Sequence, residues 1–220
     1  MLADKDTVLS HLLQKDKSTR YFYRNMLQND FKNEKRNIFN KWENQFGERV
    51  EWEKVFSNIP KLTIDTQIRN FQFKILHNIY PNNYILSKMG IKESPLCNLC
   101  SPFRDSLIHY IWECNKSQQF WRSVAEWIQR IFRIRIDLSL KSIIIGYNYN
   151  VNDNDNNTIN FLILLAKHYI HCCKWNGVNP NIETIKAILK SRERAENRIA
   201  FELDKLVIHQ QKWARILYCL

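Results

Sequence analysis

Three cysteines and one histidine lie in a short window near the middle of the chain, at a spacing that suits one metal ion. Two residues separate Cys97 from Cys100, eight more precede His109, and four more precede Cys114. Two cysteines this close share a tight turn, and the later pair closes a tetrahedron of donors, as in structural zinc sites. Four protein ligands leave no open position for a substrate. The spacing therefore predicts one structural Zn²⁺ and no catalytic metal.

A second group of ligand-type residues lies further along the chain, within an otherwise apolar stretch. Helical spacing places His168 and Cys172 on one face, beside His171 and Cys173. Free cysteines are commonly buried as small apolar side chains. We therefore interpret this group as core.

The run from Asn152 to Asn157 invites a calcium interpretation, because Asp153 and Asp155 alternate with other residues. A calcium loop next requires a glycine and, at its twelfth position, a glutamate. Thr158 and Leu164 stand at those two places. We therefore interpret the run as a polar, solvated loop.

The composition favours a helical, basic protein. Hydrophobic residues make up 45% of the 220 residues, so a core can form, and only 4 Gly and 5 Pro are present, which favours long helices over many short strands. The net charge of +11 predicts affinity for polyanions. The longest apolar run, residues 161–166, is far shorter than the roughly 20 residues of a membrane span. No secretory signal is evident, so six cysteines indicate thiols and metal ligands in an intracellular protein, cytoplasmic or nuclear.

Apolar residues at steps of three and four predict helices on both sides of the cysteine window. We divide the chain into a helical segment at 1–90, a zinc-binding segment with its following helix at 91–135, and a helical segment at 136–220. Residues 142–149 are interpreted as a short strand or an extended connection, and residues 159–175 as the most buried helix. The apolar positions on which the N-terminal helices depend are Tyr21, Phe22, Met26, Leu27, Ile38, Phe39, Trp42, Phe46, Trp52, Val55, Phe56, Ile64, Ile68, Phe71, Ile75 and Ile79.

Two more helices are expected after the cysteine window. The first runs from about Ser117 to Arg133, with Asn115 as its N-cap, and the second is one long helix from Asn181 onward. Trp213, Leu217 and Tyr218 look exposed on that last helix.

The residues around the cysteine window resemble the zinc-binding region near the C-terminus of non-LTR (LINE-type) retrotransposon reverse transcriptases. The resemblance covers roughly residues 60–130 and rests on a helix that ends in a proline turn at Tyr80-Pro81, followed by a set of short motifs. These motifs are Leu-Cys-Asn-Leu-Cys at 96–100, Asp-Ser-Leu-Ile-His at 105–109, Trp-Glu-Cys at 112–114 and Phe-Trp at 120–121. Asp105 and Trp121 fill the family's acidic and tryptophan positions.

The resemblance implies a mainly α region with the four ligands named above, which binds template RNA and target DNA beside a polymerase. It does not imply polymerase activity, because the aromatic-x-Asp-Asp motif of the catalytic site is missing from this sequence. We therefore expect RNA or single-stranded DNA as partner and no enzymatic activity in this chain alone. The basic residues expected to contact phosphates are Arg69, Lys74, Lys88, Lys92, Arg104, Lys116 and Arg122.

Two other functions stay open at this point. A helical protein-interaction module with a purely structural zinc would use the C-terminal helix to bind a protein partner. A metal-dependent nuclease would need converging acidic residues, but Glu51, Glu53 and Asp65 are scattered among Trp and Lys, so we find no catalytic arrangement.

Overall fold

The computed structural model describes residues 38–149 and 151–218. The chain forms two compact units, Met1–Arg49 and Val50–Leu220. In the first unit, residues 38–46 are helical, as predicted, and the rings of Trp42 and Phe46 stack with their centroids 5.6 Å apart. The predicted apolar stripe formed by Tyr21, Phe22, Met26 and Leu27 lies outside the described residues.

The second unit is built from helices, and its described residues contain no strand, which confirms the predicted mainly α class. The three-segment division at residues 90 and 135 stays a prediction. No helix in the described ranges is long and apolar enough to cross a membrane. The helices are α3 (Trp52–Leu62), α4 (Thr66–Leu76), α5 (Asn83–Lys88), the π-helix η1 (His109–Glu113), α6 (Asn115–Phe132), α7 (Leu140–Ile145), α8 (Asp153–Asn176), α9 (Ile182–Glu202) and α10 (Leu206–Tyr218).

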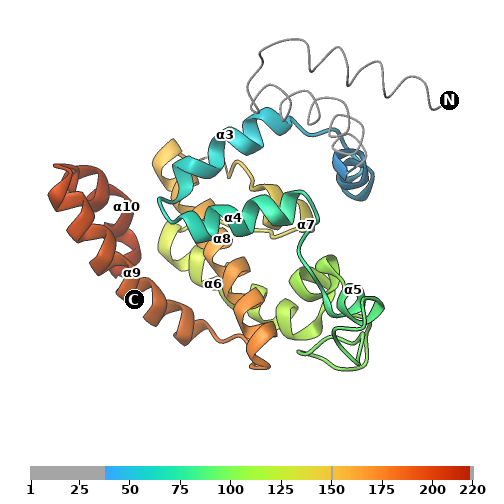
Figure 1. Cartoon of the computed structure of the whole chain (residues 1–220). Coiled ribbons are helices and arrows are strands. Elements are labelled where there is room, and N and C mark those ends of the chain that lie inside the picture. Colours follow the sequence, from blue (N-terminus) through green and yellow to red (C-terminus); the bar gives the residue numbers. More distant parts are fainter. Residues whose placement is uncertain (1–37, 150, 219–220) are drawn as a thin grey trace, which may run out of the picture. The chain divides into compact units, whose positions relative to one another are not determined.

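Helix α8 is the centre of the second unit, in agreement with the prediction that residues 159–175 are the most buried helix. It contacts α3, α4, η1, α6, α7 and α10, and Figure 1 shows it passing between α4 and α6. Apolar side chains from residues 161 to 166 are buried around its whole circumference. A helix that is apolar on all sides is stable only when neighbours cover it completely.

Helix α6 buries one face and exposes the other. Five apolar residues on one face of the helix are buried, namely Phe120, Val124, Trp127, Ile128 and Ile131. The helix starts two residues earlier than predicted, and its N-cap is Cys114 rather than Asn115. The helix ends at Phe132 because Arg133 takes the left-handed conformation, with φ 53°.

The region after α6 differs from the prediction of a strand or an extended connection over residues 142–145, whereas residues 146–149 are neither helix nor strand. Residues 140–145 form helix α7, because Ser139 and Ser142 exchange capping hydrogen bonds at its N-terminus. Side chains of α4 and α8 donate hydrogen bonds to the carbonyl groups at its end. Gln72 Nε2 donates to Ile144 O at 2.8 Å, and Lys167 Nζ donates to Ile143 O at 2.7 Å. Burial lowers the pKa of Lys167 to about 7.

Two further expectations are corrected near the polar run and α4. Asn152 is the N-cap of α8, so residues 153–157 begin that helix instead of forming a loop. Ile64 and Ile79 were predicted on the apolar face of α4, but both lie outside that helix and are more than half exposed. Ile68, Phe71 and Ile75 within α4 are buried as predicted.

The C-terminal region forms two helices rather than the predicted single one. Asp204 takes a left-handed conformation with φ 54°, and Lys205 N–H donates to Ala200 O at 2.7 Å, so the chain turns between α9 and α10. The turn lets α10 pack on α9, α8 and α6.

This turn also buries one residue that was predicted to be exposed. Trp213 is buried completely, its ring packs edge-on against Phe161 at 5.9 Å, and its Nε1 donates to Glu196 Oε2 at 3.0 Å. The prediction of exposure is therefore wrong for Trp213. It is confirmed for Leu217 and Tyr218, which are 43% and 93% exposed.

We expect Trp213→Ala to lower the free energy of unfolding by about 3–5 kcal/mol, because it leaves a cavity under α10 and removes one of the two donors to the Glu196 carboxylate. Chemical denaturation followed by circular dichroism measures the loss. The matched control is Tyr218→Ala, which should change stability by less than about 0.5 kcal/mol because the ring is exposed. Equal effects of the two substitutions would contradict this packing.

Candidate metal centre

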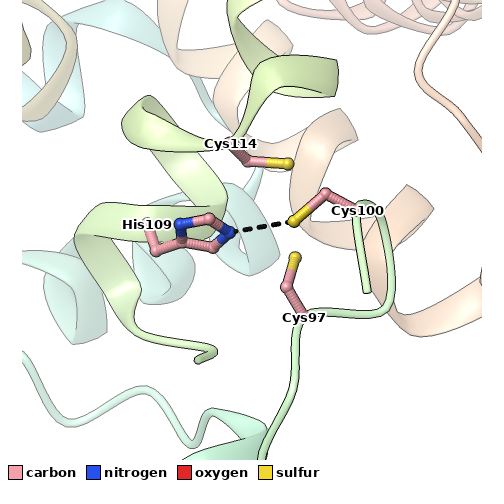
Figure 2. Close-up of side chains that lie close together, drawn as sticks. All are labelled: Cys97, Cys100, His109 and Cys114. Carbon is pink, nitrogen blue, oxygen red and sulfur yellow. Dashed lines mark hydrogen bonds between the residues drawn. The ribbon is translucent and has the colours of Figure 1, made fainter. Parts of the chain in front are cut away.

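The four predicted ligands converge on one point. One donor atom from each of Cys97, Cys100, His109 and Cys114 lies within 4.8 Å of all the others. Figure 2 shows the three sulfurs and the imidazole pointing toward one another, from a loop on one side and a helical segment on the other. Three of the four residues are buried and Cys100 is partly buried. The residues therefore fit a single metal ion held by protein atoms alone.

The first two ligands lie on a short hairpin, residues 95–105. Its ends are joined by three backbone hydrogen bonds of 2.9 Å, which are Cys97 N–H to Phe103 O, Ser101 N–H to Cys97 O, and Asp105 N–H to Pro95 O. Leu96 and Arg104 form an isolated antiparallel bridge beside them. Backbone N–H groups of Leu99 and Cys100 stabilise a charged Cys97 sulfur. The hairpin thus presents two sulfurs to the same side and supplies donors for their negative charge.

The other two ligands are brought together by a π-helical turn. In a regular α-helix, residues five apart point about 140° away from each other, so His109 and Cys114 would diverge. Here residues 109–113 form the π-helix η1, and Cys114 N–H donates to His109 O at 2.7 Å. This wider turn brings residue i+5 above residue i, and such turns are frequent at functional sites.

Side chains of α6 provide hydrogen-bond donors for the carbonyl groups of that irregular turn. Three carbonyl groups of η1 receive hydrogen bonds from α6: Tyr110 O from Ser117 Oγ at 2.6 Å, Ile111 O from Trp121 Nε1 at 2.7 Å, and Trp112 O from Gln118 Nε2 at 2.6 Å. Buried carbonyl groups without partners would destabilise the fold. Trp121, predicted from the family pattern, therefore supports the centre through the backbone and not through the metal.

The three thiols do not titrate alike. The hydrogen bond from Cys97 lowers the pKa of Cys114 to about 5, and the backbone N–H groups of Ser117 and Lys116 at the start of α6 act in the same direction. The same pairing with Cys114, together with burial, raises the pKa of Cys97 well above its ordinary value. Burial, and then the charge on Cys114, raises the pKa of Cys100. One thiolate thus suppresses ionisation of its neighbours, and a divalent cation would relieve that repulsion.

The imidazole is oriented with Nε2 toward the sulfurs. His109 Nε2 lies 3.2 Å from Cys100 Sγ, while Nδ1 faces the Glu113 carboxylate, with 4.0 Å between Nδ1 and Oε2. Carboxylates in this position commonly orient histidine ligands and fix their tautomer. His109 Nε2 is therefore the donor atom of the site.

A buried ion pair anchors the hairpin to the body of the unit. Asp105 Oδ2 lies 2.6 Å from Lys174 Nζ on α8, and both side chains are fully buried. The same oxygen accepts from the backbone N–H of Asn83 at 2.6 Å. Asn83 Nδ2 donates to Leu96 O and to Asn98 Oδ1, both at 2.7 Å. The hairpin that carries Cys97 and Cys100 is therefore held by α5 and α8 before any metal binds.

The other groups of ligand-type residues do not form metal sites in the described ranges. His168 Nδ1 and Cys172 Sγ lie 3.9 Å apart without a third donor. His171 belongs to an aromatic cluster, where it accepts from Trp175 Nε1 at 2.9 Å and lies 3.2 Å from Tyr110 Oη. Burial lowers the pKa of His171 to about 3, so the ring stays neutral. The interpretation of this group as core is in line with these contacts.

Of the basic residues predicted to bind nucleic acid, Arg104 lies on the hairpin, and Lys88 and Lys92 lie on the segment that precedes it. Arg104 lies over the ring of Tyr84 at 3.1 Å, with Lys88 4.6 Å from the same ring. Lys92 is 4.9 Å from the ring of Trp175 and donates to Asn83 Oδ1 at 3.1 Å. These contacts place positive charge on aromatic faces next to the cysteines.

The other four basic residues lie on α4 and α6. Arg69 donates to Thr63 O at 2.6 Å and to Pro60 O at 3.1 Å, which fixes the end of α3. Lys74 is exposed and lies 5.6 Å from the ring of Tyr80. Lys116 is partly buried and Arg122 is exposed, both on α6. Nucleic-acid binding by any of the seven residues stays a prediction.

Comparison of the chain with protein-family models and with curated proteins finds no match. The assignment of the site therefore rests on the residues themselves.

Sequence reasoning missed the anchoring residues Lys174 and Asn83 as parts of the site. A lysine inside the most apolar helix itself indicates a buried ion pair, because lysine is almost never fully buried without a partner. Its partner could not be identified from the sequence. Asn83 follows Asn82, which caps α5, and nothing in its local sequence indicates the contacts that it makes with the hairpin.

We expect Cys97→Ser and His109→Ala each to abolish binding of one metal ion per chain and to lower the thermal midpoint, because metal binding at a closed site contributes directly to folding. Elemental analysis and thermal unfolding measure the two effects. The control is Cys172→Ser, which removes a partly buried thiol outside the centre and should retain the metal. An unchanged midpoint in both ligand variants would argue against a structural metal.

Removing one partner of the Asp105–Lys174 ion pair should destabilise the protein more than replacing both partners together. Asp105→Asn leaves Lys174 buried without its counter-ion, so we expect a loss of about 3–5 kcal/mol in the free energy of unfolding. The double variant Asp105→Asn with Lys174→Met should lose less than the sum of the two single variants. Urea denaturation of the four proteins gives the interaction energy, and simple additivity would show that the two side chains do not interact.

Proposed function

We propose that the metal is zinc and that the chain is a zinc-stabilised, nucleic-acid-binding accessory region without catalytic activity of its own. The observation that carries this proposal is the convergence of four buried or partly buried sulfur and nitrogen donors. The ligand set leaves no coordination position for a substrate, which supports a role in binding.

The donor set supports zinc over other ions. Thiolate-rich tetrahedral sites favour zinc or iron–sulfur clusters, whereas magnesium and calcium prefer oxygen ligands. In a tetrahedral zinc site the sulfurs lie about 3.8 Å apart, as follows from zinc–sulfur distances of about 2.3 Å. The four donor atoms lie within 4.8 Å of one another, so they need to move only slightly closer together to reach that geometry. Free thiols of this kind persist in reducing intracellular compartments.

The charge distribution supports nucleic acid as the partner. The chain carries a net charge of +11. Exposed Arg104 lies on the metal-binding hairpin, and exposed Lys88 contacts the same tyrosine ring as Arg104 does. Phe103, on the same hairpin, is 60% exposed. Basic side chains that contact phosphates and aromatic rings that stack on unpaired bases are the usual elements of single-strand binding. The resemblance to the zinc-binding region of LINE-type reverse transcriptases points to the same partner class.

A protein-interaction module is the second candidate, and one observation favours it. Four apolar side chains that are 58–72% exposed lie at the end of α9, in the turn after it and at the start of α10, namely Phe201, Leu203, Val207 and Ile208. Exposed apolar surface is typical of interaction sites. The double variant Phe201→Ser with Val207→Ser separates the two candidate functions. It removes apolar surface that an interaction module would use, and it should leave nucleic-acid binding unchanged.

We expect the zinc-loaded chain to bind a labelled single-stranded RNA or DNA, with affinity falling steeply between low and physiological salt. Fluorescence anisotropy at a series of salt concentrations gives the affinity and its salt slope. The Cys97→Ser variant, which distorts the hairpin next to Arg104, should bind more weakly with a smaller slope. Zinc content with no binding at low salt would refute the nucleic-acid role and leave the interaction module.

A further inference from the structure

The exposed face of α6 carries mostly positive charge. The apolar face of this helix is buried against the rest of the unit, so the opposite face is left to solvent. Lys116, Arg122 and Arg130 lie on that side, and Glu126 is the acidic residue among them. Because α6 contains 18 residues, the face extends over about 27 Å, starting at the metal ligand Cys114.

An open hollow lies at the far end of this face, where α6 stops. It is lined by Glu126, Gln129, Arg130, Arg133, Ile134 and Arg135. All three arginines are exposed. In the described ranges no carboxylate lies within ion-pair distance of them, and Arg130 Nε donates only to the backbone carbonyl of Glu126, at 3.4 Å. Three arginines thus line one concave surface, and within the described ranges none of them is paired with Glu126, the acidic residue of the same lining.

Arg133 occupies a backbone position that disfavours it. With φ 53° it caps α6 in the left-handed region, where glycine is the usual residue. A side chain with a Cβ atom costs free energy there compared with glycine. Backbone strain of this kind clusters at functional positions, where it is retained for the sake of the side chain.

We propose that the hollow formed by Arg130, Arg133 and Arg135 binds a backbone phosphate group of single-stranded nucleic acid. This inference rests on the proposed function and adds a second contact region to it, one helix length from the metal-binding hairpin. The planar guanidinium fork matches phosphate oxygens in pairs, so arginine is the suited side chain for such a site.

The surroundings of the hollow favour a nucleic-acid backbone over an anionic membrane. A helix that binds membranes inserts an apolar face between lipids. The apolar face of α6 is already buried in the unit, and among the residues that line the hollow only Ile134 is apolar. A strand that runs along the exposed face would meet Arg122 on its way from the hairpin to the hollow. A nucleic acid therefore gains contacts over the whole length of the helix.

Substitution of Arg133 by glycine makes the test possible without loss of fold. Arg133→Gly removes a guanidinium and at the same time relieves the left-handed backbone, so the variant should unfold at the same or a higher temperature. The full-length chain, loaded with zinc, is titrated with a single-stranded RNA of mixed sequence long enough to span α6. We expect Arg133→Gly to bind about tenfold more weakly at low salt. The salt slope should fall by about 1 for each arginine that loses a phosphate.

The charge-matched control is Arg198→Gln on α9, because the Arg198 side chain is 84% exposed and pairs with Glu202 at 3.5 Å. It should lower the affinity by much less than Arg133→Gly. If both variants weaken binding equally, the hollow is not a site, although the proposed function stands. If neither the wild-type chain nor the control binds RNA at low salt, both the function and the site are refuted. Arginine-dependent binding to phosphatidylserine vesicles without RNA binding would assign the hollow to membranes instead.

Discussion

Cys114 is subject to three constraints at once, and the arrangement of the second unit follows from them. Its sulfur has to face the other donors, its backbone N–H closes the π-turn on His109, and its position as N-cap sets where α6 begins. The first two constraints fix the direction in which α6 leaves the centre. Since α6 packs on α8, α9 and α10, a change in that direction would disturb most of the core. The candidate metal centre is therefore part of the main packing of the unit.

The hairpin on the other side of the centre depends on charge buried in the interior. Taking Asp105 and Lys174 out of water is costly, and the direct contact between them offsets much of that cost. The ion pair mainly selects one way for the hairpin to dock, because a different docking would leave one of the charges buried alone. Lys174 also lies 4.3 Å from the ring of Tyr110 in η1, so the same ammonium group touches both halves of the centre.

The sequence was sufficient for features that depend on local spacing. The four ligands, the helical class, the apolar face of α6 and the central place of α8 follow from short-range periodicity and from known ligand geometry. Features that depend on residues far apart in the chain were not accessible. The pairing of Asp105 with Lys174 and the burial of Trp213 against Phe161 depend on tertiary packing. Helix α7 was missed because three consecutive isoleucines favour a strand locally, whereas the Ser139 cap and two side chains from other helices stabilise the helix.

The π-turn also determines how this type of centre tolerates insertions and deletions. The interval between Cys100 and His109 includes the tip of a hairpin, where a change in length alters only the loop. The interval between His109 and Cys114 cannot lengthen or shorten, because one residue more or fewer would rotate Cys114 away from the other donors. Ser117, Gln118 and Trp121 share this restriction, since each satisfies one carbonyl group of the turn. A search pattern for related centres should therefore extend through Trp121, seven residues beyond the last metal ligand.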